Sequence, residues 1–200
     1  MKILFLSWGI LPQKTGGLEK ATYYYFKYLD NFDNEVYLII PNLTNDVIDF
    51  WKDKTKKSKI FGLNMKFFKT YIDYFKYESF TLYKRNIIDY RTSVIEYKNR
   101  VIKLVKDLNL DFDIIYAYDW LTSLAGIELK KIYNKPLVVH FHSLAYDRVG
   151  ANPEYLKYLI DYDYGIELEA CKYADKIIAV SKREKDALIK YYGCNENKIE

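Results

Sequence analysis

The chain has 200 residues, 50% of them hydrophobic, so it can bury a substantial core, and its length suits one domain or one lobe of a two-lobed protein. Its 31 Lys and Arg residues face 27 Asp and Glu residues, and the resulting net charge of +4 disfavours nucleic acid as the main partner. The first apolar run, at 3–11, is too short to span a bilayer and no cleavage site follows it. We therefore expect neither export nor stable membrane insertion.

The cysteines and histidines of the chain do not form a metal-binding pattern. Cys171 and Cys194 lack the spacing of a zinc site, and His140 and His142 complete no known site with them. We interpret the cysteines as two unrelated thiols in a reducing, cytoplasmic compartment, and we expect no metal site.

The first elements along the chain form a strand, helix, strand unit. An unbroken apolar run at 2–7 predicts a strand that is buried on both faces of a parallel sheet. Apolar residues at helical spacing predict a helix over 18–29, which the polar stretch at 30–34 ends. Residues 35–41 predict the second strand.

The segment from about 42 to 95 has the least regular pattern. The lysine-rich stretch at 51–59 is typical of a solvated loop, since its charges have mixed signs. The stretch at 59–71 predicts a hairpin or two short strands around Gly62 and Asn64. A clean helical period then predicts a helix over 93–110.

The second half alternates apolar runs with helical patterns. Strands are predicted at 113–118, 136–142 and 176–181, and helices at 119–133, about 153–173 and 182–192. Ser181 is placed to cap the last helix and Gly193 to end it. This alternation predicts an α/β fold with a Rossmann-like, doubly wound parallel sheet. Ligands of such sheets bind beyond the carboxyl ends of the strands, which directs attention to the loops at 8–17, 118–120 and 140–152.

The first of these loops has the composition of an anion-binding turn. Gly16 and Gly17 stand directly before the helix, whose first amides lack internal partners and attract phosphate or carboxylate oxygens. Lys14 adds a cation two residues upstream. The same glycines also suit a simple tight turn between strand and helix, and the spacing alone leaves both interpretations open. The stretch KTGGLEK is neither a G-x-G-x-x-G fingerprint nor a Walker A loop.

Four regions, the first of them made of two stretches, resemble in order the glycogen and starch synthase group of the GT-B glycosyltransferases. KILFLSW and KTGGLEKATYYYFKYL are similar to the opening strand, K-x-G-G-L loop and first helix of that group. The stretches at 113–126, 135–143 and 173–188 resemble its strand ending in H-D-W, its next strand ending in His, and its A-D-x-I-I-A-V-S strand. Tyr118 and Tyr116 stand where relatives place histidine, so a broader glycosyltransferase stays equally open.

The resemblance implies that residues 1–200 form the N-terminal, acceptor-side lobe of a GT-B enzyme whose C-terminal, donor-binding lobe is absent from this chain. It implies a retaining transfer of glucose from ADP-glucose or UDP-glucose to an α-1,4-glucan, without metal or cofactor, and a lobe that is inactive alone. The alternatives are a glycosyltransferase for a lipid or small-molecule acceptor, and a noncatalytic lobe that binds glucan or nucleotide. The expected partners are the nucleotide sugar, the acceptor and the second lobe of the same polypeptide.

The resemblance also implies roles for five residues. His142 is the catalytic candidate, since it would contact the sugar with its backbone carbonyl near the anomeric carbon. Lys14, Gly16 and Gly17 would meet the diphosphate or the sugar of the donor. Asp119 would bind hydroxyl groups of sugar or acceptor.

Each of these residues has a structural alternative. His142 also suits a hydrogen-bonded core histidine, and His140 lies on the same face of its strand. Asp119 suits the N-cap of a helix that begins at Trp120, and the capping and binding roles are compatible. Trp120 is expected in the core rather than as a platform for a sugar. Arg148, in a loop near His142, is a candidate for contact with phosphate or acceptor, but we expect it to be simply exposed.

Overall fold

The computed structural model describes residues 1–13, 16–65, 80–148, 150–151 and 161–200, and for 80–90 and 161–162 it describes the backbone alone. The strands are β1 (Lys2–Leu6), β2 (Glu35–Ile40), β3 (Lys59–Gly62), β4 (Ile114–Tyr118), β5 (Leu137–Phe141) and β6 (Lys176–Ala179). The helices are α1 (Gly17–Asn31), α2 (Asn45–Trp51), α3 (Phe80–Asp107), α4 (Trp120–Tyr133), α5 (Ala145–Arg148), α7 (Asp161–Tyr173) and α8 (Lys182–Tyr192), followed by the 3₁₀ turn η1 (Glu196–Lys198).

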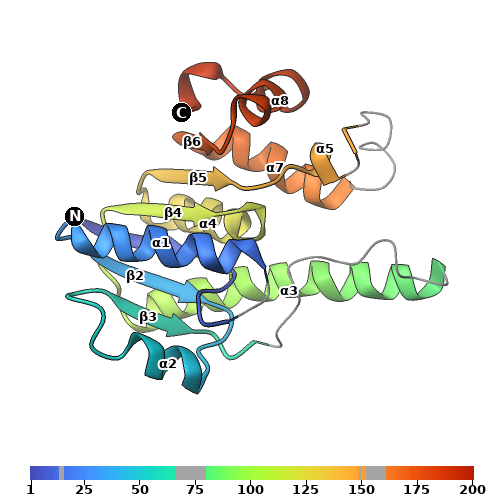
Figure 1. Cartoon of the computed structure of the whole chain (residues 1–200). Coiled ribbons are helices and arrows are strands. Elements are labelled where there is room, and N and C mark those ends of the chain that lie inside the picture. Colours follow the sequence, from blue (N-terminus) through green and yellow to red (C-terminus); the bar gives the residue numbers. More distant parts are fainter. Residues whose placement is uncertain (14–15, 66–79, 149, 152–160) are drawn as a thin grey trace.

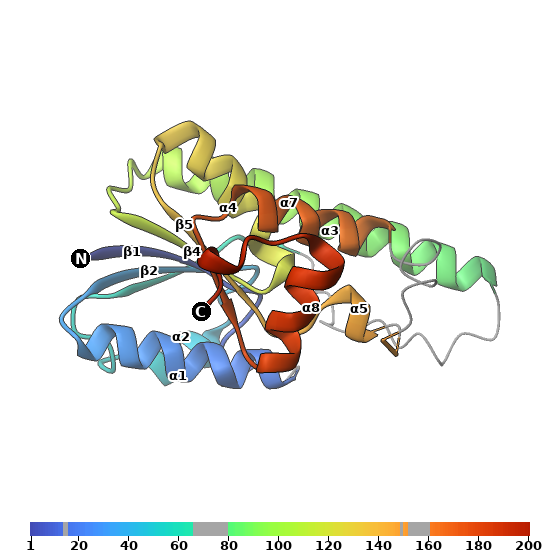
Figure 2. The ribbon, with the colours of Figure 1, turned by 90° about the horizontal axis from the view of Figure 1, so that it is seen from above.

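The strands form one parallel sheet in the order β3-β2-β1-β4-β5-β6 (Figure 1). Helices α1 and α2 cover one face of this sheet, and α3, α4 and α7 cover the other (Figure 2). This is the doubly wound, Rossmann-like arrangement that the alternating pattern predicts, and the prediction is confirmed.

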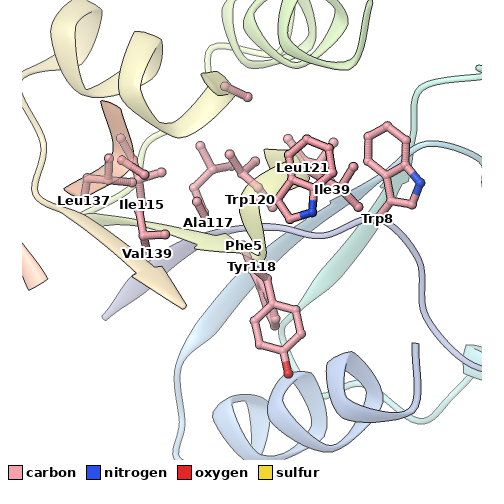
Figure 3. Packing of buried hydrophobic residues seen from close by; sticks show 14 of the residues in the cluster. Phe5, Trp8, Ile39, Ile115, Ala117, Tyr118, Trp120, Leu121, Leu137 and Val139 are labelled. Carbon is pink, nitrogen blue, oxygen red and sulfur yellow. The ribbon is translucent and has the colours of Figure 1, made fainter. Parts of the chain in front are cut away.

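The two faces of the central strands carry different side chains. Toward α4, β4 and β5 present aliphatic residues such as Ile115 and Leu137, and a Cβ added at Gly126 of α4 would lie 2.8 Å from Leu137 Cδ1. Toward α1 the same strands present aromatic rings, and Figure 3 shows Phe5 and Tyr118 directed to that helix. Phe5 packs edge-on against Tyr118, with ring centroids 5.4 Å apart. The α1 face of the sheet is therefore where polar rings lie inside the core.

The middle of the chain differs most from expectation. A hairpin or two short strands were expected over 59–71. Residues 59–62 form a parallel edge strand, β3, which pairs with β2, and residues 66–71 lie outside the described residues. The helix expected over 93–110 begins earlier, at Phe80, and ends at Asp107. Helix α2 was not expected at all. The expected helix over 153–173 is described from Asp161 onward.

The lysine-rich stretch at 51–59 is only in part a solvated loop. Its lysines are exposed, but Trp51 is buried and donates from Nε1 to the Leu11 carbonyl at 2.9 Å. The Asp30 carboxylate of α1 accepts from the backbone amides of Lys56 and Ser58. These long-range bonds join the stretch to α1, which a pattern of charges does not reveal.

The expectation of two unrelated thiols is wrong. Cys171, in α7, and Cys194, just after α8, form a disulfide with Cα atoms 5.4 Å apart. Two residues 23 positions apart meet because α7 and α8 pack against each other beside β6. The argument from free thiols to a reducing compartment loses its basis.

The predicted roles of Ser181 and Gly193 at the two ends of α8 are confirmed. Ser181 Oγ accepts from the Glu184 amide at the start of α8, and Gly193 ends that helix in the left-handed region at φ 64°. Within the described ranges, no helix has the length and apolar character needed to cross a membrane.

Candidate functional site

The carboxyl ends of the strands and the N-termini of α1 and α4 lie at one edge of the sheet, as Figure 2 shows. The loop that follows β5 and leads into α5 lies at the same edge. The three loops singled out from the sequence therefore meet where parallel sheets of this type bind ligands.

Gly17, at the end of the first loop, borders open space among the described residues. Gly16 is the N-cap of α1 with an extended backbone at φ 174°, and Gly17 is the first helical residue. A Cβ at Gly17 would meet no described heavy atom within 4 Å. Packing within the described protein therefore does not require glycine here, and contact with an anion stays a prediction. Lys14 lies outside the described residues.

His142 directly follows β5 and contacts two neighbouring rings. Its imidazole stacks on that of His140, with centroids 4.5 Å apart and planes at 22°, and the Tyr118 ring lies 4.4 Å away. Its Nε2 atom is buried and has no hydrogen-bond partner among the described residues. Burial lowers the pKa of His142 to about 4, so the ring is neutral at pH 7.

His140 lies one pleat deeper, on the same face as expected. It is fully buried, and its Nδ1 shares a hydrogen bond of 2.6 Å with the Tyr116 hydroxyl. Burial, with the neighbouring His142 as a smaller cause, lowers the pKa of His140 to about 3. Tyr25 of α1 covers it, with ring centroids 5.1 Å apart. We call Tyr116, Tyr118, His140 and His142 the imidazole cluster.

Asp119 caps α4, which confirms the structural half of the expectation. Its Oδ1 accepts from the Trp120 amide at 3.0 Å, and the His142 backbone amide also donates to its carboxylate. Burial raises its pKa to about 6, although the Arg148 charge and the two amides act in the opposite direction. Binding of hydroxyl groups by Asp119 stays a prediction. Trp120, at 3% exposure, is in the core as expected.

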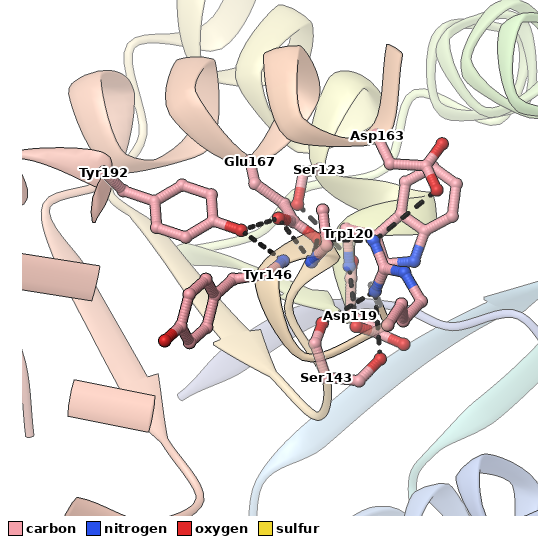
Figure 4. A network of polar contacts seen from close by, with 10 residues as sticks. Asp119, Trp120, Ser123, Ser143, Tyr146, Asp163, Glu167 and Tyr192 are labelled. Carbon is pink, nitrogen blue, oxygen red and sulfur yellow. Dashed lines mark hydrogen bonds and ion pairs between the residues drawn. The ribbon is translucent and has the colours of Figure 1, made fainter. Parts of the chain in front are cut away.

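The expectation that Arg148 is simply exposed is wrong. Its side chain is only 12% exposed, and Nη2 donates to Glu167 Oε1 at 2.7 Å (Figure 4). Nη1 donates to both Ser143 oxygens at 3.0 Å, and the guanidinium lies over the Trp120 ring. Since residues of α4, the loop after β5 and α7 all contact this one side chain, Arg148 joins three elements.

Glu167 is a buried carboxylate that sequence reasoning missed. It accepts from the Ala145 amide, the Tyr192 hydroxyl and Arg148. Burial raises its pKa to about 7, while Arg148 and the hydrogen bonds act to lower it. The sequence contains a signal for the burial of Glu167, because this residue lies next to Ile166 on the apolar side of α7. Asp119, Arg148, Asp163 and Glu167 form the second group at this edge, which we call the carboxylate cluster.

No group of three or more His, Cys, Asp or Glu side chains that could hold a metal ion occurs in the part of the chain that the structure describes. At this edge the imidazole cluster offers neutral imidazoles and tyrosine hydroxyls, and the helix starts offer backbone amides. The carboxylates and the Arg148 guanidinium beside them already bond to one another or to amides. Such a set suits hydrogen bonding to a neutral, hydroxyl-rich ligand.

Comparison with known proteins identifies the family. The family model Glycosyltransferase Family 4 matches residues 15–200. The glycogen synthase of Petrotoga mobilis is 26% identical over 88% of this chain and 42% of its own length.

Solved structures agree on the fold. Sucrose-phosphate synthase from Thermosynechococcus elongatus has a TM-score of 0.67 at 15% identity, covering 96% of this chain and 45% of its own. Anabaena HepE, solved with UDP and glucose, has a TM-score of 0.61 at 18% identity, covering 100% and 43%. This chain spans less than half the length of each of these three relatives. It belongs to glycosyltransferase family 4, and its fold is that of the N-terminal lobe of a GT-B glycosyltransferase of the glycogen synthase type.

Proposed function

We propose that the chain is the N-terminal, acceptor-side lobe of a retaining glycosyltransferase that transfers glucose from ADP-glucose or UDP-glucose to an α-1,4-glucan. Its family and its likeness to glycogen synthases support this reaction. In this proposal the donor-binding lobe follows in the same polypeptide, residues 1–200 alone are inactive, and transfer needs neither metal nor cofactor. A cytoplasmic location stays a prediction.

The observation that carries the proposal is the state of His142. Its ring is neutral at pH 7, belongs to the residue that directly follows the carboxyl end of β5, and has a buried Nε2 atom without a partner among the described residues. A neutral imidazole donates from one nitrogen and accepts at the other, which matches a sugar hydroxyl. A buried polar atom without a partner costs stability, so its retention favours a role with ligand bound.

The start of α1 would serve the departing nucleotide. As the bond between sugar and diphosphate breaks, negative charge develops on the diphosphate, and preorganised amides and cations lower the barrier. The open space beside Gly17 leaves the first amides of α1 accessible to such an anion, and Lys14 would add a positive charge.

Asp119 would act at the other side of the same site. Its carboxylate accepts from the His142 amide, so it holds the backbone of the catalytic candidate while being 4% exposed. In the proposal, Asp119 both places His142 and binds a hydroxyl of the sugar or acceptor.

A small or lipid acceptor is the second candidate. Tyr116 and Tyr118 stand where the resembling glycogen synthases have histidine, and the Tyr118 ring packs 4.4 Å from His142. Because these tyrosine rings replace histidines close to His142, they favour a pocket for a different acceptor. A noncatalytic lobe that binds glucan or nucleotide is the third.

The test is nucleotide release by the complete natural polypeptide, with ADP-glucose or UDP-glucose and with or without glycogen. We expect glycogen-dependent release that His142→Ala lowers about 100- to 1000-fold. The matched control Tyr37→Phe should retain it, because among the described residues the Tyr37 hydroxyl bonds to Glu35 of its own strand, β2. Glycogen-independent transfer to a small acceptor would support the second candidate. Glucan binding without nucleotide release from either donor would support the third candidate, the noncatalytic binding lobe.

A further inference from the structure

His140 is a polar side chain placed where the core would ordinarily hold an aliphatic one. It is fully buried within β5, and its described hydrogen bond is the one to Tyr116. Its Nε2 atom has no partner among the described residues. Burying a polar group in this way costs stability, so the presence of histidine here calls for a reason other than packing.

A line of contacts leads from the core through His140 to His142. Phe5 packs edge-on against Tyr116 with centroids 5.0 Å apart, and Tyr116 bonds to His140 Nδ1. The His140 ring then stacks on His142 at 4.5 Å, almost parallel. The line ends at the edge of the sheet, at the ring proposed to contact the sugar.

The hydrogen bond is what distinguishes His140 from an ordinary ring at this position. The χ2 wells of a histidine are broad, so packing alone allows the buried ring a range of tilts, whereas a 2.6 Å bond at Nδ1 narrows that range and sets which edge of the imidazole faces Tyr116. The plane of His140 in turn restricts the plane of the ring stacked on it. The orientation of His142 is thereby tied to a hydroxyl one strand away.

We propose that His140, fixed by its hydrogen bond to Tyr116, is a positioning residue that sets the ring orientation of His142. Because His142 is a proposed site residue, this role rests on the proposed transferase function. His140 itself does not contact the substrate, since Tyr25 of α1 and the rings of the imidazole cluster enclose it.

The first test is kinetic and uses the complete polypeptide. Tyr116→Phe and His140→Phe keep the rings and remove the hydrogen bond, so we expect each to lower kcat about 10- to 100-fold with the donor KM unchanged. The double variant should lose no more than either single variant. In a His142→Ala background, neither substitution should lower the remaining transfer further, because both act through His142.

The second test does not require activity. Diethyl pyrocarbonate modifies neutral imidazole nitrogens, and peptide mass spectrometry gives the rate of modification at His142. We expect Tyr116→Phe and His140→Phe to raise this rate several-fold, and Tyr37→Phe, which removes a comparable bonded hydroxyl on β2, to leave it unchanged.

Two outcomes overturn the proposal. One is an unchanged modification rate at His142 in Tyr116→Phe. The other is a loss of transfer that persists in the His142→Ala background, which indicates a general structural role. If no donor supports transfer, the proposed function fails, and the modification rates alone decide the role of His140. The modification rates are also the deciding measurement in two other cases. If His142→Ala abolishes transfer, no remaining transfer can be compared. If His140→Phe does not fold, Tyr116→Phe takes its place.

Discussion

Two buried polar clusters lie side by side at the carboxyl edge of the sheet, and their hydrogen bonding differs. In the imidazole cluster, the Nε2 atoms of His140 and His142 and the Tyr118 hydroxyl have no partner among the described residues. In the carboxylate cluster, Glu167 accepts hydrogen bonds from the Ala145 amide, the Tyr192 hydroxyl and the Arg148 guanidinium. The Asp119 carboxylate, which accepts from the His142 amide, joins the two clusters.

The comparison separates structural from functional polarity. A saturated network contributes stability and holds several elements in one arrangement, and it has little capacity left for a ligand. Unpaired buried atoms cost stability and keep capacity for a ligand. We therefore expect substitutions of Arg148 and Glu167 to change mainly stability, and substitutions of His140 and His142 to change mainly transfer.

The largest effect is expected for Glu167→Ala. It leaves the mostly buried Arg148 without its closest partner and removes acceptors from Ala145 and Tyr192, so the free energy of unfolding should fall by about 3–5 kcal/mol. Urea unfolding measures it. The matched control is Glu128→Ala, whose half-exposed ion pair with Lys131 spans 4.0 Å and should change stability by about 0.5 kcal/mol at most. Equal effects at the two sites would contradict the structural role of Glu167.

His142→Ala should lower transfer and leave stability nearly unchanged. We expect transfer to fall about 100- to 1000-fold, the scale of losing one preorganised contact to the reacting groups. The free energy of unfolding should change little, because the ring is partly exposed and its Nε2 atom is unpaired. A variant that unfolds more readily but transfers normally would place His142 with the structural residues.

The two clusters should also give stability opposite dependences on pH. The pKa values of His140 and His142 are lowered, so the folded state binds fewer protons than the unfolded state, and stability is lost as pH falls from about 6.5 toward 4. The pKa of Glu167 is raised to about 7, so its contribution is present below about 4.5 and is lost as pH rises through 7. The two effects oppose each other between about pH 4.5 and 6.5.

Substituting the titrating group of one cluster should make the pH dependence contributed by the other cluster visible. In urea unfolding at pH 4.5, 5.5 and 6.5, Glu167→Gln should make stability rise more steeply with pH than in the unsubstituted protein. His140→Phe should make it rise less steeply or fall. The change in slope is at most about 1.4 kcal/mol per pH unit for each proton. Unchanged slopes in both variants would mean that these groups titrate alike in the folded and unfolded states.

The smallest contrast is between two tyrosine hydroxyls. Tyr192→Phe removes a hydroxyl that donates to Glu167 at 2.7 Å and accepts from the Tyr146 amide, so it should cost about 1 kcal/mol. Tyr118→Phe removes a buried hydroxyl that has no described partner, and stability should stay the same or rise. Thermal unfolding of the two variants side by side measures the difference. A larger loss in Tyr118→Phe would reveal a partner for that hydroxyl.

Local signals explain what the sequence predicts well. The central strands are buried on both faces, so they appear as unbroken apolar runs, and Ser181 and Gly193 bound α8 through contacts within a few residues. Helix α2 escapes prediction because it is brief and depends on its neighbours, and the parallel pairing of β3 with β2 escapes for the same reason. The disulfide between Cys171 and Cys194 depends on the packing of two helices, which no spacing rule encodes.

The candidate site follows the same division. The position of His142 after a buried strand predicts its place at the edge, and the alternation of β5 predicts that His140 shares its face. The bond between Tyr116 and His140 requires the register of β4 against β5, which the sequence does not supply. The bond from Arg148 to Glu167 joins the short helix α5 to α7, 19 residues later, and became visible only with the fold.

The most direct test of the account is a pair of amide replacements in the complete polypeptide, Glu167→Gln and His142→Gln, each measured for unfolding free energy and for glucose transfer. We expect Glu167→Gln to lose stability while each folded molecule keeps its transfer rate. His142→Gln should keep its stability and lose transfer. If both variants lose the two properties in equal measure, the distinction between a structural and a functional cluster is contradicted.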